Sequence, residues 1–190
     1  MYGLKQDPRV WYSKLDNYLL KCGFKRGASG NNLCVKEKDG KLFVVVVYVD
    51  DIIFSSDSYL MTNEFVVDMK VEFEMSMIGE LSYFVGLQIV QNPNNIFIYQ
   101  GKYLKEVLKK FGMEECLMVS TPMVTGCKLS KIFESPEVGH TLYRSIIGIL
   151  LYLIASRPDI RQVIAIVGIF QVAPRQSHLL EAKKILRYLA

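Results

Sequence analysis

The sequence predicts an α+β protein, with its strands concentrated before residue 100 and helices after it. Two observations support this prediction. Before residue 100 the apolar residues form short, often β-branched runs, whereas after it they recur every three to four positions, which is the helical period. With 190 residues, of which 51% are apolar and 22% charged, the chain is large enough for one domain or two subdomains, and general disorder is excluded.

The first predicted helix begins at Asp7-Pro8. Aspartate is a good N-cap, and proline has the backbone angle of a first helical residue. The apolar residues that follow repeat on one helical face, and Gly23 provides a left-handed stop. A polar loop over residues 27–32 is then expected.

The central predicted strand is the run from Leu42 to Val49, which is apolar and mostly β-branched. We expect such a run to be buried on both faces in the middle of a sheet. Asp50-Asp51 interrupts it and the apolar residues 52–54 resume it, so the simplest geometry is a tight hairpin with two carboxylates at its tip. A helix over residues 59–73 follows.

Further strands are expected from Leu81 to Val90 and from Ile96 to Tyr99, joined by a turn over residues 92–95. The rest of the chain is predicted to be helical, apart from an irregular segment over residues 113–138. The expected helices cover residues 102–111, 140–155 and 159–172 and a final segment that ends near Leu189. We therefore divide the chain into a first part, residues 1–100, and a second part, residues 101–190.

Charge, cysteine spacing and hydropathy narrow the class of protein. Residues 1–100 carry 10 basic and 12 acidic residues, and residues 101–190 carry 13 and 7. An acidic site beside a polyanion-binding surface is one interpretation, and ordinary solvated charge is the other. The four cysteines lack zinc-finger spacing, so we expect reduced thiols in an intracellular protein, either cytoplasmic or nuclear. No membrane segment is expected, because the longest apolar runs are about half the length that crosses a bilayer and no secretory signal opens the chain.

The sharpest feature is Tyr48-Val49-Asp50-Asp51. Two like charges at the end of a buried strand repel each other, and a divalent cation removes that conflict. Mg²⁺ prefers one or two protein carboxylates together with phosphate oxygens and water, and pairs of such ions serve polymerases. The simpler alternative is a polar turn that contains Asp-Asp by chance.

Several further segments occur together with this motif. They are residues 2–12 (YGLKQDPRVWY), 73–81 (FEMSMIGEL), 84–89 (FVGLQI), 120–123 (STPM), 142–144 (LYR), 156–160 (SRPDI) and 185–189 (ILRYL). In these residues and their order, the chain resembles the reverse transcriptase region of Ty1/copia-type retrotransposon Pol polyproteins. Residues 2–12 look like motif B, residues 48–51 like motif C, and residues 73–89 like the segment that leads into the primer-grip hairpin. The later segments resemble the thumb and connection.

The resemblance implies a fold and a function. Residues 1–100 would be a partial palm, an antiparallel sheet with helices on one face, and residues 101–190 a helical thumb and connection. The partners would be an RNA or DNA template–primer and a deoxynucleoside triphosphate, with Mg²⁺ or Mn²⁺ as cofactor. No protein partner is implied.

The resemblance also implies roles for individual residues. Asp50 and Asp51 would be the catalytic metal ligands. The nucleotide and template pocket would contain Lys5, Gln6, Arg9 and Tyr48. The primer grip would contain Phe84, Gly86, Leu87 and Gln88, and the nucleic-acid surface Lys102, Lys105, Lys109 and Lys110.

Structural roles are the alternatives for several of these residues. The aromatic pair Trp11-Tyr12 is expected to pack in a helix rather than stack on bases. Gly86 could simply allow close backbone approach in a strand, and the four lysines could be a solvated face. Arg157-Pro158-Asp159 is expected to be a helix break with a cap.

The family's palm also uses a third carboxylate, in motif A, on a strand that precedes motif B. The 190 residues show no counterpart of it, nor of the fingers, and Asp16 cannot replace it because it belongs to the helix after motif B. Without that strand the hairpin would leave an apolar sheet edge open. Mg²⁺ needs near-octahedral coordination, so we expect the chain alone to be inactive as a polymerase. The alternatives are a nonspecific nucleic-acid-binding remnant and a decayed reading frame without activity.

Overall fold

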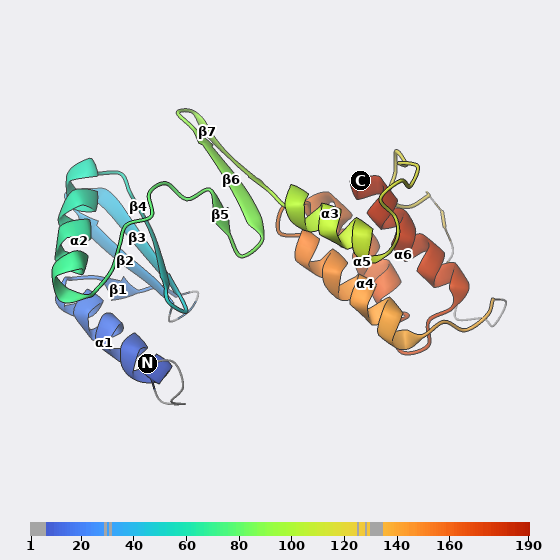
Figure 1. The fold of residues 1–190 in the computed structure, drawn as a ribbon, viewed down its shortest axis with the longest axis horizontal. Helices are drawn as coiled ribbons and strands as arrows, with labels where there is room; N and C mark the ends of the chain where they lie inside the picture. Colours follow the sequence, from blue (N-terminus) through green and yellow to red (C-terminus); the bar gives the residue numbers. More distant parts are fainter. Residues whose placement is uncertain (1–6, 29, 31, 125, 128, 130–134) are drawn as a thin grey trace. The chain divides into compact units, whose positions relative to one another are not determined.

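The chain folds into two compact units that divide at residue 80 (Figure 1). The computed structural model describes residues 7–28, 30, 32–124, 126–127, 129 and 135–190. We call residues up to Glu80 the sheet unit and residues from Leu81 the helical unit. Antiparallel sheets and helices occur together, so the predicted α+β class is confirmed. The strands of residues 83–99 lie in the helical unit, so the boundary falls earlier than residue 100. The assignment of the two parts to a palm and a thumb stays a prediction.

The sheet unit is a four-stranded antiparallel sheet with two helices. Its elements are α1 (Asp7–Lys21), β1 (Lys25–Arg26), β2 (Leu33–Lys38), β3 (Lys41–Tyr48), β4 (Asp51–Ser56) and α2 (Tyr59–Glu72), and the strand order is β1-β2-β3-β4. The helix α1 begins at the predicted residue, and Gly23 beyond its end has a φ of 86°. The strands β1 and β2 were not predicted, because β2 reads LCVKEK and its polar end hides the apolar pattern.

The core of the sheet unit lies on one face of the sheet. Phe43, Val45 and Val47 of β3 are buried there, whereas Val44 and Val46 on the other face are only half-buried. The prediction that β3 is buried on both faces is therefore wrong, because the helices α1 and α2 contribute their apolar sides to one core. That core contains Leu15, Leu19, Phe24, Cys34, Phe43, Val45, Val47, Phe65 and Met69.

The helical unit begins with a small sheet and continues as helices. Its elements are β5 (Tyr83–Phe84), β6 (Leu87–Asn92), β7 (Asn95–Tyr99), α3 (Gly101–Lys110), α4 (His140–Leu153), the 3₁₀ helix η1 (Pro158–Ile160), α5 (Arg161–Gly168) and α6 (Gln176–Leu189). The predicted strand over residues 81–90 is split by a turn at Val85-Gly86, where both φ angles are positive, as a type I′ hairpin requires. The helix predicted over residues 159–172 is shorter and ends at Gly168.

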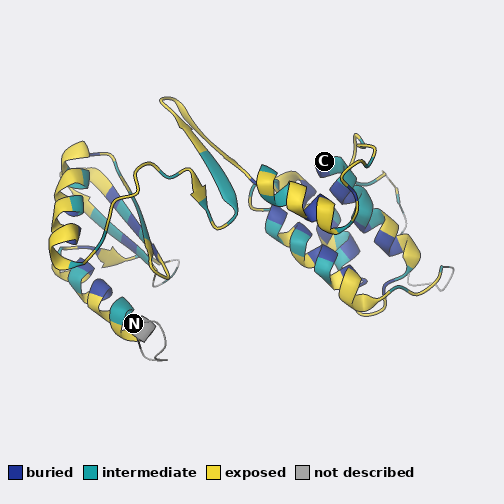
Figure 2. Ribbon diagram, in the orientation of Figure 1, coloured by how far each residue is buried: buried dark blue, intermediate teal, exposed yellow. Residues whose placement is uncertain are grey.

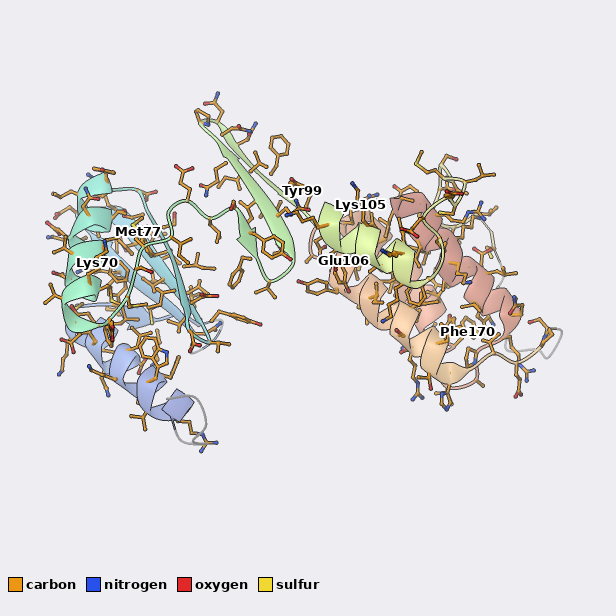
Figure 3. All side chains as sticks on the ribbon, viewed as in Figure 1. Lys70, Met77, Tyr99, Lys105, Glu106 and Phe170 are labelled. Atoms are coloured by element: carbon orange, nitrogen blue, oxygen red, sulfur yellow. The ribbon has the colours of Figure 1, made fainter. Side chains whose placement is uncertain are left out.

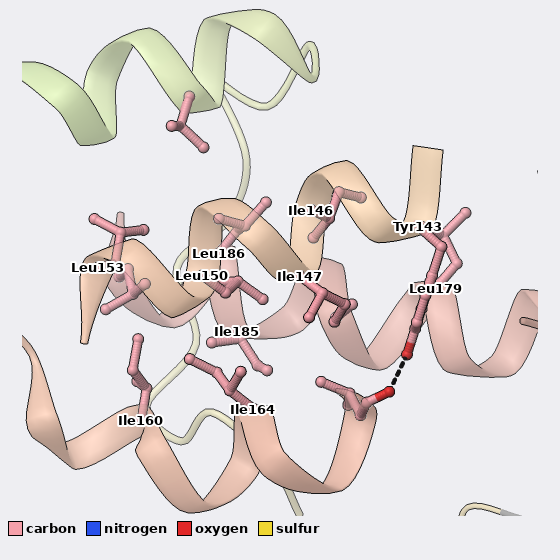
Figure 4. Close-up of a cluster of buried hydrophobic side chains, with 14 of the residues drawn as sticks. Tyr143, Ile146, Ile147, Leu150, Leu153, Ile160, Ile164, Leu179, Ile185 and Leu186 are labelled. Carbon is pink, nitrogen blue, oxygen red and sulfur yellow. Dashed lines mark hydrogen bonds between the residues drawn. The ribbon is translucent and has the colours of Figure 1, made fainter. Parts of the chain in front are cut away.

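The helices α4, α5 and α6 enclose the core of the helical unit (Figure 4). Its fully buried side chains include Ile146, Leu150 and Ile185. The hydroxyl of Tyr143, which is also fully buried, donates a 2.7 Å hydrogen bond to the Val167 carbonyl and joins α4 to α5. Burial raises the pKa of Tyr143 to about 12. Within the described ranges no helix combines the length and apolarity needed to span a bilayer.

Candidate active site

The hairpin formed by β3 and β4 ends in the predicted acidic tip. Tyr48 pairs with Asp51 across the two strands, so Val49 and Asp50 form a two-residue turn. The expected tight hairpin is confirmed, and it brings Tyr48, Asp50 and Asp51 together. Val49 has a φ of 54°, which is an outlier for a β-branched residue and costs about 1–3 kcal/mol. The paired strands on both sides hold this strained turn in place.

Both carboxylates of the acidic tip are exposed. In the part of the chain that the structure describes, neither of them accepts a hydrogen bond or pairs with a cation. Adjacent carboxylates with no neutralising side chain are suitable oxygen ligands for a hard cation such as Mg²⁺. The described residues contain no cluster of three or more potential metal-ligating side chains, however. The remaining ligands would have to be phosphate, water or a carboxylate from outside these residues.

The other predicted pocket residues lie near the start of the chain. Arg9 is exposed on α1, and Lys5 and Gln6 lie outside the described residues. Their role in nucleotide or template binding stays a prediction. The ring centroid of Trp11 lies 5.5 Å from that of Phe73, which supports the packing role expected for this tryptophan.

Asp16 is a buried carboxylate on α1, and it is already paired. Its Oδ1 accepts a 3.1 Å hydrogen bond from Nε of Arg26, and its Oδ2 pairs with a terminal nitrogen of the same guanidinium. This bidentate contact fixes α1 against β1. Asp16 is therefore engaged by Arg26 inside the sheet unit.

The segment predicted as the primer grip is the hairpin that opens the helical unit. Phe84 and Leu87 pair across its first turn, and Gly86 occupies the turn with a φ of 77°. A Cβ atom on Gly86 would lie 2.9 Å from the hydroxyl oxygen of Tyr152, which donates a hydrogen bond to the Val85 carbonyl. Glycine at position 86 is therefore explained by the positive φ of the turn and by the close approach of Tyr152 from α4, not by a place in the interior of a strand.

Gln88 connects this hairpin to the first helix after it. Its Oε1 accepts a 2.8 Å hydrogen bond from the backbone N–H of Lys102, and its Nε2 donates to the Tyr99 hydroxyl at 3.3 Å. The residue before α3, Gln100, makes no capping bond with its own side chain. Gln88 therefore satisfies a donor at the N-terminus of α3 that would otherwise lack a side-chain acceptor.

Gln100 links the end of β7 to α4 and is buried. Its Nε2 donates to the Tyr152 carbonyl at 3.4 Å, and its Oε1 accepts a 2.7 Å bond from the Ser156 hydroxyl. Sequence reasoning missed Gln100, Tyr152 and Ser156. The only local signal was a polar residue at the junction of a strand and a helix, and its partners lie more than 50 residues away.

The four lysines predicted as a nucleic-acid surface are all exposed on α3, whose opposite side buries Val107 and Leu108. Lys105 and Glu106 are labelled on this helix in Figure 3. The ammonium of Lys102 lies 5.7 Å from the ring centroid of Tyr83 on the hairpin. The basic helix face is thus present, and its role in binding nucleic acid stays a prediction.

The SRPD segment has a structural role. Arg157 donates two hydrogen bonds to the Asp159 carboxylate, at 3.0 and 2.8 Å, and the Tyr188 hydroxyl donates a third at 2.9 Å. The bonds from Arg157 are the main reason that the pKa of Asp159 is lowered to about 2. These contacts join the start of η1 to α6, as expected for a helix break rather than a ligand site.

Carboxylates that hold paired divalent cations are used by enzymes that make or break phosphate esters, among them nucleic-acid polymerases, and the acidic tip offers two such carboxylates. Comparison with known families agrees with this class. Residues 1–125 match the sequence model of the family described as "Reverse transcriptase (RNA-dependent DNA polymerase)". The chain therefore belongs to the reverse transcriptase family.

Curated relatives narrow the family to retrotransposons. The chain is 35% and 32% identical, over 190 residues, to the retrovirus-related Pol polyproteins from transposons RE1 and RE2 of Arabidopsis thaliana. It is 30% identical over 199 residues to that from transposon TNT 1-94 of Nicotiana tabacum. Each alignment covers all of this chain but only 13% of the RE1 and RE2 polyproteins and 15% of the TNT 1-94 polyprotein. No solved structure matches the chain.

Proposed function

We propose that the chain supplies the catalytic hairpin and the thumb of a retrotransposon reverse transcriptase that carries out template-directed DNA synthesis. The observation that supports this most strongly is the exposed pair Asp50 and Asp51 at the tip of a rigid hairpin, with no described side chain neutralising it. When bound there, divalent cations would activate the primer 3′-hydroxyl and stabilise the leaving pyrophosphate. Asp50 and Asp51 hold the cations, and Tyr48 lies beside the primer terminus.

A third carboxylate completes this site from outside the 190 residues. The family's motif A strand carries it, and the sheet of this chain has a place for such a strand, because β4 is at the edge of the order β1-β2-β3-β4. A strand added beside β4 would lie next to the acidic tip, where Asp51 begins β4. Asp50 and Asp51 bind a divalent cation by themselves, but without a third carboxylate they do not fix the near-octahedral coordination that catalysis with Mg²⁺ needs. The chain alone is therefore inactive as a polymerase.

Manganese binding to the isolated chain tests the metal site without requiring catalysis. Mn²⁺ should broaden the amide NMR signals of residues 48–51 through its unpaired electrons, and Asp50→Asn should remove that broadening. Asp39 provides the matched control, because it is an exposed aspartate in the turn between β2 and β3, at the other end of β3. Broadening of equal size around Asp39, or none at the acidic tip, would contradict the proposed metal site.

A second candidate function is nonspecific nucleic-acid binding by α3, which carries four lysines and one glutamate in ten residues. Lysines on an exposed helix face neutralise phosphates without reading sequence. The affinity should therefore fall steeply with added salt, and glutamine at Lys102, Lys105, Lys109 and Lys110 should flatten that dependence. If these substitutions leave the salt dependence of the affinity unchanged, α3 does not take part in nucleic-acid binding.

A further inference from the structure

The helix α2 of the sheet unit is apolar on two opposite sides. One side lies in the core, where Phe65 and Met69 are buried. Leu60, Val67 and Val71 share the other side, because they are spaced by seven and four residues, and they are 67%, 59% and 83% exposed. A surface helix normally keeps its apolar residues on the core side, and a helix that is apolar all round usually has neighbours all round. We call Leu60, Val67 and Val71 the outer stripe.

The outer stripe is a continuous surface rather than a set of scattered residues. Figure 2 shows exposed residues along α2, and the stripe covers about three turns of it. Single exposed apolar residues are common and need no explanation, whereas contiguous ones mark interaction sites. Valine also favours a helix less than lysine, glutamate or glutamine, which are the usual residues of an exposed helix face. Two valines on this face therefore gain little unless a partner covers them.

Carboxylates border the outer stripe along one flank. Glu64 and Asp68 lie one turn apart there, and neither forms an ion pair with any residue that the structure describes. Glu72, one turn further, is different because it pairs with Lys14 at 3.5 Å. Lys70 lies on the opposite flank of the stripe, so the charge around the stripe is asymmetric. The acidic flank is thus free to receive cations from a partner.

Apolar and acidic groups meet in a shallow hollow on this side of α2. The side chains that line it are Asn63, Glu64, Val67 and Asp68. When two helices pack, side chains of one helix fill the hollows between side chains of the other. Lysine and arginine suit this hollow, because their aliphatic stems cover apolar surface while their charged ends reach carboxylates.

We propose that the outer stripe is the docking site for an amphipathic helix of a protein partner that carries lysine or arginine along one flank. The apolar side of that helix covers the stripe, and its basic flank neutralises Glu64 and Asp68. Nucleic acid and anionic membranes do not fit this site, because the two carboxylates repel them. The docking goes beyond the proposed polymerase function and does not depend on it.

A second copy of the chain is a poorer occupant than a basic helix. An antiparallel pairing of two α2 helices places the acidic flank of one copy against the acidic flank of the other, where like charges repel. The stripe is also small, since a stable complex between separate proteins uses about 20–30 residues a side. A single docked helix, by contrast, matches a stripe of about three turns.

Amide NMR on the full 190-residue chain tests the docking site with two synthetic helical peptides of about 15 residues. The lysine peptide has leucines at helical spacing on one side and lysines along one flank, and the glutamate peptide has glutamate in place of each lysine. The lysine peptide should shift the amide signals of residues 60–71, and added salt should weaken its binding. The glutamate peptide should leave these signals unchanged.

Substitutions in the outer stripe identify the contact. Val67→Gln and Val71→Gln should each weaken binding of the lysine peptide about fivefold, because they remove apolar surface from the contact. Glutamine favours a helix more than valine does, so α2 should stay folded. Glu64→Gln should weaken the binding and reduce its salt dependence. Val172→Gln is the matched control, because Val172 is 81% exposed in the helical unit, and it should change nothing.

The comparison of the two peptides uses the wild-type chain, so it decides the question even where a variant is unstable. Equal binding of both peptides would overturn the proposal, because charge would not select the occupant. Absence of any shift with the lysine peptide, or shifts confined to residues outside α2, would overturn it as well. If sedimentation of the chain alone shows a dimer that Val67→Gln dissociates, the outer stripe is a self-association surface and the docking of a basic helix is rejected.

Discussion

The hydrogen bond between Tyr143 and Val167 allows a quantitative prediction about the helical unit. Tyr143 is fully buried, and its hydroxyl donates to the Val167 carbonyl at 2.7 Å. Tyr143→Phe removes that donor and keeps the ring, so no large cavity forms. The Val167 carbonyl also accepts a 3.2 Å bond from the Phe170 N–H and keeps a partner in the variant. The loss should therefore be close to one net hydrogen bond, about 1 kcal/mol, rather than the larger cost of an orphaned buried acceptor.

Thermal unfolding followed by two signals isolates this effect. The single tryptophan, Trp11, lies in the sheet unit, so its fluorescence reports on that unit, whereas far-ultraviolet circular dichroism also reports on the helices of the helical unit. Tyr143→Phe should lower the helical transition by roughly 5 °C and leave the tryptophan transition unchanged. Tyr188→Phe is the matched control, because the Tyr188 hydroxyl donates to the exposed carboxylate of Asp159. This variant should lower the helical transition temperature much less.

The pH dependence of the same variant provides an independent check. The pKa of Tyr143 is raised from 10.0 to about 12 in the folded protein, so folding favours its protonated form. The stability that this supplies is complete below pH 10 and is lost as the pH rises toward 12. Tyr143→Phe should therefore lose less stability than the wild type over that range. An unchanged thermal transition together with an unchanged alkaline profile would refute the reasoning.

Three further predictions concern the acidic tip, the α1 contact and the helix break. Val49→Gly should raise the free energy of unfolding of the sheet unit, measured by urea titration, by up to about 1 kcal/mol, because glycine adopts a positive φ without strain. A lower free energy of unfolding in this variant would argue against strain at the acidic tip. Arg26→Met should destabilise the sheet unit more than the double variant Arg26→Met/Asp16→Asn does, because the single variant leaves the buried Asp16 carboxylate without its partner. Equal losses of stability in the two variants would show that the unpaired charge is not the cause. The pKa of Asp159 is lowered to about 2, chiefly by Arg157, so its stabilising contribution is present above pH 3.8 and is lost as the pH falls toward 2. The stability of Asp159→Asn, followed by circular dichroism, should therefore change less with pH over that range than the stability of the wild type.

The features predicted correctly from the sequence are those that local patterns determine. The β3–β4 hairpin follows from an apolar run broken by two aspartates, and the helices α2, α3 and α6 follow from apolar residues at helical spacing. The acidic tip was located because its residues are adjacent in the chain. Burial on one face of β3 was not foreseen, because four consecutive valines among its eight residues hide the alternation that the helices impose.

The features that were missed depend on distant residues. Val85-Gly86 is not one of the usual type I′ turn sequences, and the turn is held by Tyr152, 67 residues beyond Val85. The bonds of Gln100 to Tyr152 and Ser156 have separations of 52 and 56 residues. The sequence shows no partner for His178, yet this residue is buried, caps α6 by accepting a 3.0 Å hydrogen bond from the Arg175 N–H and stacks on Phe170. Such contacts become visible only once the helices are packed.

The central claim is that Asp50 and Asp51 hold catalytic metal once a third carboxylate is supplied from outside these residues. Primer extension on an RNA template with Mg²⁺ tests it directly, using this chain alone and the chain joined to the preceding reverse transcriptase segment of the RE1 polyprotein. We predict no synthesis by the chain alone, synthesis by the joined protein, and loss of that synthesis in its Asp50→Asn variant but not in its Asp39→Asn variant. Robust synthesis by the chain alone, or synthesis by the joined protein that survives Asp50→Asn, would contradict the account.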